Sequence, residues 1–259
     1  MRGIAIITGA TGGIGKVFVE YALRYELAEI WAIARNGERL SALREEYGER
    51  LVPIPADLST PEGIETVQAL LRERKPLVKY LVNNAGIGKM GAYHEFSQEE
   101  VIRTIDVNCK APVLLCHICI PYMASGSRIL NIASAAAFQP NPYLNLYAAS
   151  KAFERNYSRA LHVELAGSGI TVTAVCPGWV DTGLLTREIN GKPVRFPGMV
   201  TAERVVKRAF YDADRGRDMS ICSLYGRLQH LNVKWMPQRL TMKLWMRGIR
   251  AYGYGQPVK

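Results

Sequence analysis

A tyrosine and a lysine four positions apart are the residues of this chain with the clearest chemical potential. Tyr147 and Lys151 fall in an amphipathic helical pattern, and residues at this spacing lie on the same face of a helix. A free tyrosine has a pKa of about 10 and transfers few protons at neutral pH, but a nearby ammonium favours the phenolate. The pair is therefore a candidate general acid and base. Without further context, an ordinary surface pair is the alternative interpretation.

A glycine-rich segment follows the first strand-like run of the sequence. Gly9, Gly12, Gly13 and Gly15 lie between the apolar run 4–8 and a helical pattern. Glycine permits a tight turn and a close approach of the backbone to a pyrophosphate, and the free N–H groups of a following helix attract anions. Although glycines also occur in purely structural turns, this position between strand and helix favours dinucleotide binding.

The elements that must position these residues alternate along the chain. The apolar runs are continuous, which is typical of strands buried on both faces of a parallel sheet, and the helical patterns between them are long enough for crossovers. The predicted strands are 4–8, 30–34, 51–55, 80–83, 127–133, 170–175 and 219–222, and the predicted helices are 16–25, 38–47, 61–74, 97–123, 146–165 and 201–212. We therefore expect an α/β fold with a doubly wound parallel sheet in three layers, of Rossmann type. Residues 1–222 would form the single domain, and residues 223–259 a helical extension.

Composition excludes several other classes of protein. The chain has 259 residues, of which 48% are hydrophobic and 22% charged, which is ordinary for a packed globular domain and excludes disorder, collagen and coiled coil. No apolar run approaches the roughly 18 residues that span a bilayer. The first strand begins too soon after Met1 for a signal peptide, and the five cysteines are odd in number and lie in apolar surroundings. These features predict reduced, buried thiols and a cytoplasmic location.

The net charge of +10 is concentrated at the C-terminal end. Residues 219–259 contain no Asp or Glu, and seven of the basic residues lie there. A helix starting at Pro237 would align Arg239, Lys243, Arg247 and Arg250 in one stripe beside apolar residues such as Trp245. Such a helix suits an anionic membrane surface, but it equally suits a lid or a subunit contact, and the extension could serve more than one of these roles. Nucleic-acid binding is not favoured, because no recognition fold accompanies the basic residues.

Several motifs, in order, resemble those of the classical short-chain dehydrogenase/reductase family. The resemblance runs from Gly3 to about Thr182 and continues more weakly through 201–212. The motifs are Thr8-Gly9-x-x-x-Gly13-x-Gly15, Ala56-Asp57-Leu58, Asn83-Asn84-Ala85-Gly86, Tyr147-x-x-x-Lys151 and Pro177-Gly178. One departure is the alanine run 135–137, where many members of the family carry a second serine and a glycine.

The resemblance implies a catalytic tetrad of Asn108, Ser134, Tyr147 and Lys151. Ser134, thirteen positions before Tyr147, would bind the carbonyl oxygen, and Asn108 would hold a water in the proton path to Lys151. The implied cofactor-binding residues are Gly9, Thr11, Gly13, Ile14, Gly15, Arg35, Asn36, Asp57, Leu58, Asn84, Ala85, Gly86, Tyr147, Lys151, Pro177, Gly178, Val180 and Thr182.

The residues that close the second strand bear on the choice of nicotinamide cofactor. An acid at this point favours NAD(H), because it binds the ribose hydroxyls and repels a 2′-phosphate. Here the sequence is Ala34-Arg35-Asn36, and a guanidinium can fork onto a phosphate. NADP(H) is therefore favoured over NAD(H), although Gly12 stands where the family carries a second basic marker.

The resemblance implies an NADP(H)-dependent oxidoreductase that interconverts a carbonyl and a secondary alcohol, with the pro-S hydride transferred and Tyr147 acting as general acid or base. The segment 184–199 has little charge and matches the family's substrate loop, which suggests a lipophilic small-molecule substrate. A homodimer or homotetramer through helices 97–123 and 146–165 is also implied. A non-catalytic NADP(H)-binding sensor or scaffold is the alternative, because a fold alone does not decide function.

No metal site is predicted. Cys116 and Cys119 have C-x-x-C spacing but lie within a predicted helix, and no second cysteine pair completes a zinc site. His94, His162 and His230 have no partners at ligand spacing.

Overall fold

Seven parallel strands form the central sheet of the computed structural model, which describes residues 2–182, 185, 188–189, 192–250 and 253–254. The strands are β1 (Ile4–Thr8), β2 (Ile30–Ala34), β3 (Leu51–Pro55), β4 (Val78–Asn83), β5 (Arg128–Ile132), β6 (Thr171–Val175) and β11 (Met219–Ser220). They stand in the order β11-β6-β5-β4-β1-β2-β3. The order reverses between β1 and β4, and ligands of such sheets bind outside the carboxyl ends of the strands at this point.

Both faces of the sheet are buried, as the continuous apolar runs predicted. Ala5 and Ile7 of β1 belong to the core on one face, and Ile4 and Ile6 belong to the core on the other. This alternation follows from the two-residue period of a strand. It confirms the doubly wound architecture.

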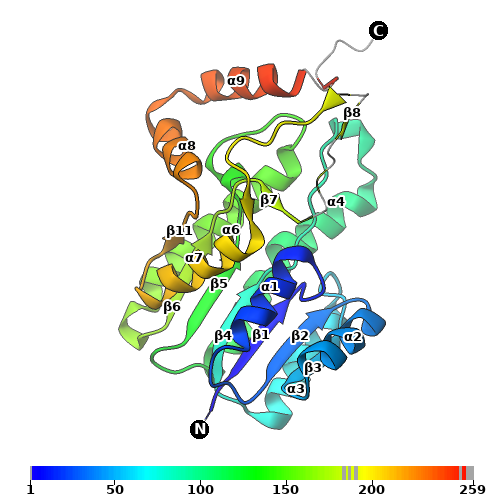
Figure 1. Ribbon diagram of the computed structural model, residues 1–259, viewed down its shortest axis with the longest axis vertical. Helices are drawn as coiled ribbons and strands as arrows, with labels where there is room; N and C mark the ends of the chain where they lie inside the picture. The colour runs from blue at the N-terminus through cyan, green and yellow to red at the C-terminus, as the bar shows by residue number, and fades with distance from the viewer. Residues whose placement is uncertain (1, 183–184, 186–187, 190–191, 251–252, 255–259) are drawn as a thin grey trace.

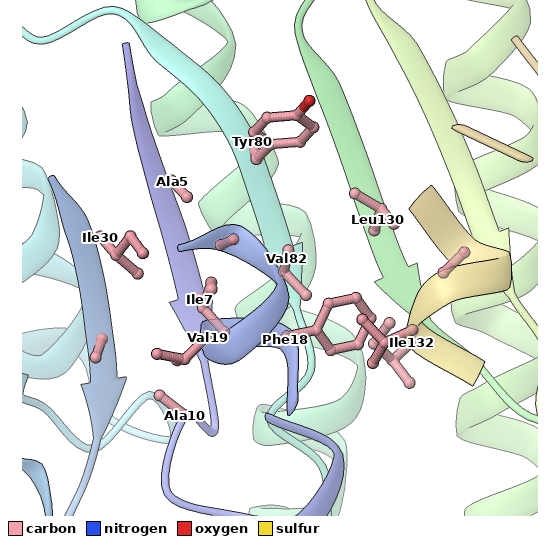
Figure 2. Close-up of a cluster of buried hydrophobic side chains, with 14 of the residues drawn as sticks. Ala5, Ile7, Ala10, Phe18, Val19, Ile30, Tyr80, Val82, Leu130 and Ile132 are labelled. Atoms are coloured by element: carbon pink, nitrogen blue, oxygen red, sulfur yellow. The ribbon is translucent and has the colours of Figure 1, made fainter. Parts of the chain in front are cut away.

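Helices cover the two faces as separate layers (Figure 1). One layer contains α1 (Gly13–Ala22), α2 (Gly37–Tyr47) and α7 (Ala202–Asp214), and the other contains α3 (Pro61–Arg74), α4 (Gln98–Ile105), α5 (Ala111–Cys119) and α6 (Asn145–Glu164). Figure 2 shows the first layer, where Phe18 and Val19 of α1 lie among Ile7, Val82 and Ile132 of the strands. The three-layer prediction is confirmed.

An aromatic cluster holds α1 and α7 together at the edge of this first core. Phe210 of α7 is fully buried, and its ring centroid lies 4.8 Å from that of Tyr21 and 5.3 Å from those of Tyr25 and Tyr80. Aromatic pairs at these separations add stability beyond the apolar area that they bury.

The structure divides the predicted helix 97–123 into shorter helices, because a π-helical turn interrupts it. This turn, η2 (Asp106–Lys110), lies between α4 and α5, and a 3₁₀ turn, η3 (Ile120–Tyr122), ends the segment. The N–H of Ala111 donates to the carbonyl of Asp106, five residues back. Pro112 has no N–H to give to the carbonyl of Asn108, four residues before it. The carbonyl of Asn108 therefore lacks its usual α-helical donor.

Other predicted boundaries shift by a few residues. Helix α1 begins at Gly13, three residues before the predicted start, because the glycine turn leads directly into it. Side-chain caps fix other starts: Thr60 accepts from the N–H of Gly63, and Ser97 and Glu100 form a capping box.

Two helices form the C-terminal extension and lie beyond the carboxyl edge of the sheet (Figure 1). They are α8 (Leu224–Trp235) and α9 (Gln238–Arg250). Pro237 precedes α9, and its carbonyl accepts hydrogen bonds from the N–H groups of Leu240 and Thr241. The indole of Trp245 donates to the carbonyl of Pro142 at 2.8 Å. The helical extension is thus confirmed, and it packs on the loop between β5 and α6.

Short strand pairs occupy the described part of the segment after β6. Strand β7 (Val180–Asp181) pairs with β10 (Val200–Thr201), and β8 (Glu188–Ile189) pairs with β9 (Lys192–Pro193). Across the described ranges, no helix has both the length and the apolarity needed to cross a bilayer.

The aromatic cluster leads to a prediction about stability. We expect Phe210→Ala to lower the free energy of unfolding by about 3–5 kcal/mol, because it leaves a cavity beneath three tyrosine rings. Urea denaturation followed by circular dichroism measures the change. Tyr211→Ala on the same helix is the control, since Tyr211 is 44% exposed and should cost less than about 1 kcal/mol. Equal losses in the two variants would contradict this assignment of the core.

Candidate active site

The N-terminal half of α6 brings Tyr147 and Lys151 to the carboxyl end of β5. Lys151 is only 4% exposed, whereas Tyr147 is half-buried. The ammonium of Lys151 donates to the carbonyl of Ile132 at 2.6 Å and to the carboxylate of Glu154 at 2.7 Å. Its Nζ lies 5.9 Å from the centroid of the Tyr147 ring. The cation therefore stands close enough to act electrostatically on the phenol.

Two glycines allow the loop after β4 to pass directly over this pair. A Cβ atom on Gly86 would lie 3.3 Å from Nζ of Lys151, and one on Gly88 would lie 3.1 Å from the ring of Tyr147. Larger residues would push the loop away from α6. The glycines thus set the close packing of the loop on the candidate catalytic pair.

Ser134 lies two residues after β5 and caps the start of a 3₁₀ turn, η4 (Ala135–Phe138). Its Oγ accepts a hydrogen bond from the N–H of Ala136 at 3.1 Å, so its own proton can be donated elsewhere. The N–H of Ala135 donates to the carbonyl of Pro177 at 2.7 Å. The alanine run that departs from the family pattern therefore forms an ordered turn that positions Ser134.

Asn108 connects the π-helical turn to the loop and to α6. Its side-chain amide exchanges two hydrogen bonds of 2.8 Å with the backbone of Ile87 and donates to Ser150 Oγ at 3.0 Å. The side chain is therefore committed to holding these segments together. Its backbone carbonyl, which Pro112 leaves without an α-helical donor, is the group that a water could use.

The glycine turn is packed so tightly that side chains would not fit at three positions. Gly9 has φ +62°, and a Cβ there would lie 2.8 Å from Asn84 Nδ2, while a Cβ on Gly13 would lie 2.7 Å from Thr182 Cβ. A Cβ on Gly15 would overlap the carbonyl oxygen of Gly9. No side chain caps α1, and its first turn has no acid. The N–H groups and the dipole at the start of α1 thus fit a bound diphosphate.

Asn84 anchors this turn from the end of β4. Its Nδ2 donates to the carbonyl of Thr8 at 3.1 Å and to that of Gly9 at 3.2 Å, and the N–H groups of Asn84 and Ala85 donate to Thr8 Oγ1 at 2.9 Å. Asn84 and Ala85 therefore hold the carboxyl ends of β1 and β4 together.

Four further residues predicted to bind cofactor lie just after β2 and β3. Arg35 is exposed, whereas Asn36 caps α2 by accepting from the N–H of Arg39 at 2.9 Å. Asp57 accepts from the hydroxyl of Ser59 at 2.7 Å and from Arg103 at 2.6 Å. Partial burial opposes its charge, but these hydrogen bonds outweigh burial and lower the pKa of Asp57. Leu58 is buried.

A surface depression of about 240 Å³ lies beside the glycine turn. Thr11, Lys16 and Arg39 line it, together with Ala42, Leu43 and Glu46. The sequence prediction included Thr11 but missed the two cations. Lys16 is four residues from Gly12 and lies on α1, and this helical spacing was the signal that could have found it.

The segment after β6 completes the site on the side away from Arg35. Pro177 and Gly178 follow the strand, Val180 is buried in β7, and Thr182 lies against Gly13. Residues 184, 186–187 and 190–191 of the predicted substrate loop lie outside the described residues.

A buried polar chain beneath the site was not predicted. Asn83 donates to Asn131 at 2.8 Å, Asn131 donates to Ser158 at 2.8 Å, and Ser158 donates to the carbonyl of Glu154 at 2.6 Å. Glu154 and Ser158 share the buried face of α6 with Lys151. The three- and four-residue spacing of these polar residues was the signal in the sequence.

The cysteines remain free thiols. Cys116 and Cys119 are buried, and burial raises the pKa of Cys116 to about 12 and that of Cys119 well above its ordinary value. Within the described part of the chain, no group of three or more His, Cys, Asp or Glu side chains could hold a metal ion.

Comparison with known proteins agrees with this geometry. The family model described as short chain dehydrogenase matches residues 3–192. The NADP-dependent 3-hydroxy acid dehydrogenase YdfG of Salmonella typhi is 34% identical over 184 residues, which cover 68% of this chain and 72% of that protein.

Two solved structures extend the similarity over the C-terminal helices. A short-chain dehydrogenase from Sphingobium yanoikuyae in complex with NADPH is 29% identical, with a TM-score of 0.75 and coverage of 99% of each chain. The bulky-bulky ketone specific alcohol dehydrogenase from Comamonas testosteroni is 27% identical, with a TM-score of 0.72 and coverage of 99% of this chain and 96% of that one. The chain belongs to the short-chain dehydrogenase/reductase family of oxidoreductases.

Proposed function

We propose that this protein is an NADP(H)-dependent oxidoreductase that interconverts a carbonyl and a secondary alcohol on a lipophilic small molecule. The observation that carries the proposal is the placement of Tyr147 beside the buried ammonium of Lys151, where the loop at Gly86 and Gly88 packs on both. Ser134 stands at the end of the neighbouring strand with a hydroxyl proton to donate. A non-catalytic sensor would not need this combination.

The proposed chemistry assigns one task to each side chain. A bound nicotinamide would supply or accept the hydride. Ser134 would donate a hydrogen bond to the carbonyl oxygen as charge develops on it, and Tyr147 would give that oxygen a proton, or remove it in the reverse direction. Lys151 would favour the phenolate form by its charge, and the carbonyl of Asn108 would hold a water for proton exchange. Gly9, Thr11, Gly13, Ile14 and Gly15 would hold the diphosphate.

Two arginines support NADP(H) as the cofactor. Arg35 is exposed at the end of β2, and Arg39 lines the depression beside Thr11, where Lys16 is paired with Glu46 at 3.0 Å. Arg39 lies in the first turn of α2. It can bind the 2′-phosphate in place of the second basic residue of the family, at whose position this chain has Gly12. One relative is named as NADP-dependent, and one similar structure is a complex with NADPH.

Apolar surfaces support the remaining parts of the proposal. Ile102 and Ile105 on α4 and Phe153 on α6 are large apolar residues about half exposed, which is consistent with a homodimer or homotetramer built through these helices. A bulky-ketone alcohol dehydrogenase among the similar structures is consistent with a lipophilic substrate.

We propose that the C-terminal extension is a lid over the substrate side of the site. Trp245 is hydrogen-bonded to Pro142, and the ring of His230 on α8 lies 4.5 Å from that of Phe138 on η4. Both contacts fall on the loop between Ser134 and Tyr147. The alternatives are a subunit contact and an anionic membrane surface, because α8 leaves Trp235 88% exposed.

Turnover tests the main proposal. We expect NADPH-dependent reduction of bulky apolar ketones, and we expect Tyr147→Phe to lower kcat by about 10²–10⁴-fold, because the general acid is lost. Tyr143→Phe, four residues earlier in the loop that precedes α6, is the control and should keep most of the activity. NADPH binding by fluorescence should persist in Tyr147→Phe. Binding of NADPH by the unmodified protein without turnover of any carbonyl would support the sensor instead.

Cofactor preference is tested at Arg35. We expect Arg35→Glu to raise the KM for NADPH at least about tenfold and to leave the KM for NADH within about twofold, because a carboxylate repels the 2′-phosphate. Arg44→Glu on the far end of α2 serves as the matched charge change. A wild-type preference for NADH would refute the assignment.

The lid is tested by comparing two tryptophans of the extension. We expect Trp245→Ala to raise the KM for the apolar ketone several-fold with the KM for NADPH unchanged, because the contact with Pro142 is lost. Trp235→Ala should leave both values unchanged. Sedimentation with phosphatidylserine vesicles is measured in parallel, and binding that Trp235→Ala abolishes would favour the membrane alternative.

A further inference from the structure

The carboxylate of Glu154 is buried against the lysine of the candidate catalytic pair. Its side chain is 1% exposed, and its Oε2 lies 2.7 Å from Nζ of Lys151. Lys151 stands one helical turn from Tyr147 on one side and three residues from Glu154 on the other. Removing two charges from water is costly unless each is well paired. The placement of this carboxylate therefore calls for a reason beyond helix stability.

The other titratable groups around the pair carry no charge near neutral pH. Cys109 faces it from η2, Cys116 from α5 and Cys176 from the end of β6. Burial raises the pKa of Cys109 above its ordinary value and raises the pKa of Cys116 and Cys176 to about 12, so all three remain thiols. Among the described residues, Lys151 is the only cation within ion-pair distance of Glu154.

The hydrogen bonds of Lys151 also hold its ammonium in place. An ammonium has three N–H donors, and Lys151 uses two of them on the carbonyl of Ile132 and on Glu154. The third N–H is left for the side of the site where Gly86 and Tyr147 lie.

We propose that Glu154 is a positioning residue of the active site, the buried counter-ion that fixes the ammonium of Lys151 and whose own protonation sets the net charge that Tyr147 faces. The inference rests on the proposed roles of Tyr147 and Lys151. It assigns to the site a second ionisable group, which lies behind the lysine and touches neither substrate nor cofactor.

The pH dependence follows from the two protonation states of Glu154. Burial raises the pKa of Glu154 to about 7, although Lys151 acts in the opposite direction. Burial also opposes the charge on Lys151, but the attraction of Glu154 and Tyr147 outweighs it, and the pKa of Lys151 is raised. Below about pH 7 the pair carries one net positive charge, and above it the pair is neutral. Above this pH, a phenolate on Tyr147 therefore faces a neutral pair. It is stabilised less than it would be by a lysine without a counter-ion.

Titration of the Tyr147 phenol tests this inference without any need for turnover. The near-ultraviolet absorbance of the phenolate is followed with pH in the full chain, and the same titration of Tyr147→Phe is subtracted to isolate one of the 13 tyrosines. We expect Glu154→Gln, with its own Tyr147→Phe background, to lower the midpoint by about one pH unit, because it removes a negative charge near the phenol. Glu154→Asp keeps the charge and should shift the midpoint less. Coinciding midpoints of wild type and Glu154→Gln would overturn the proposal.

The pH profile of kcat for alcohol oxidation is the second readout. In Glu154→Gln, the pH at which kcat falls on the acidic side of the profile should be lower by about one unit. Glu154→Asp should largely retain the wild-type profile. A uniform fall of kcat at every pH would mean that Glu154 is merely structural and would overturn the proposal. If the wild type oxidises no alcohol, the proposed function fails, whereas the phenol titration still decides the role of Glu154.

Infrared spectroscopy of the unmodified protein guards against misfolded variants. A buried protonated carboxyl group gives a carbonyl band apart from those of exposed acids. We expect such a band at acid pH that disappears through about pH 7 in wild type and is missing in Glu154→Gln. A wild-type protein with no such band would overturn the proposal.

The change of the unfolding free energy with pH provides a further check. The pKa of Glu154 is raised in the folded state, so the stability that its protonation contributes is present below its unfolded pKa and is lost as pH rises through about 7. The difference in unfolding free energy between wild type and Glu154→Gln should therefore favour wild type more at pH 5 than at pH 8. The opposite trend would contradict the raised pKa.

Discussion

The burial of one ammonium group is the constraint on which the architecture of the site depends. Lys151 is removed from water beneath the carboxyl edge of the sheet, and an unpaired charge there would destabilise the fold by several kcal/mol. The strand end at Ile132 supplies a carbonyl, α6 supplies Glu154, and the loop after β4 closes over the group through Gly86. Three separate segments are thus fixed in place by the need to satisfy one cation.

The polar residues around this cation act on the backbone as much as on any ligand. Asn84 ties the glycine turn to β4, Asn108 ties the loop to α6, and Asn36 caps α2. Asp57 is engaged by Ser59 and Arg103. Motif residues that are predicted to contact a cofactor therefore also build the edge on which it would rest. Substitutions at these positions will affect folding and binding together, which is why Tyr147 and Glu154 are more informative positions for separating the two.

Sequence predicted the sheet and the helix of Tyr147 and Lys151 well, because their signals are local and repeated. The strands β1, β2 and β6 are buried along their whole length and mainly apolar. Tyr147 and Lys151 share a helix face wherever the helix begins. The π-helical turn at Asn108 could not be read from periodicity, although the sequence does show Pro112, which leaves the carbonyl of Asn108 without its α-helical donor. No prediction was made for Glu154, because the spacing of Lys151, Glu154 and Ser158 marks one face of a helix without showing that this face is buried.

The C-terminal extension is a second feature whose role could not be decided from the sequence pattern. Its amphipathic pattern was compatible with lid, subunit contact or membrane surface, since all three need one apolar face. In α9, Thr241, Trp245 and Ile249 point toward the protein, and the basic residues Arg239, Lys243, Arg247 and Arg250 are exposed. In α8, the apolar residues Leu224, Leu228, Leu231 and Trp235 are exposed at helical spacing. Trp245 of α9 thus points inward onto the loop that carries Ser134, whereas this apolar row of α8 points outward. The contact with the loop and the apolar surface open to another molecule are therefore separate features of one extension.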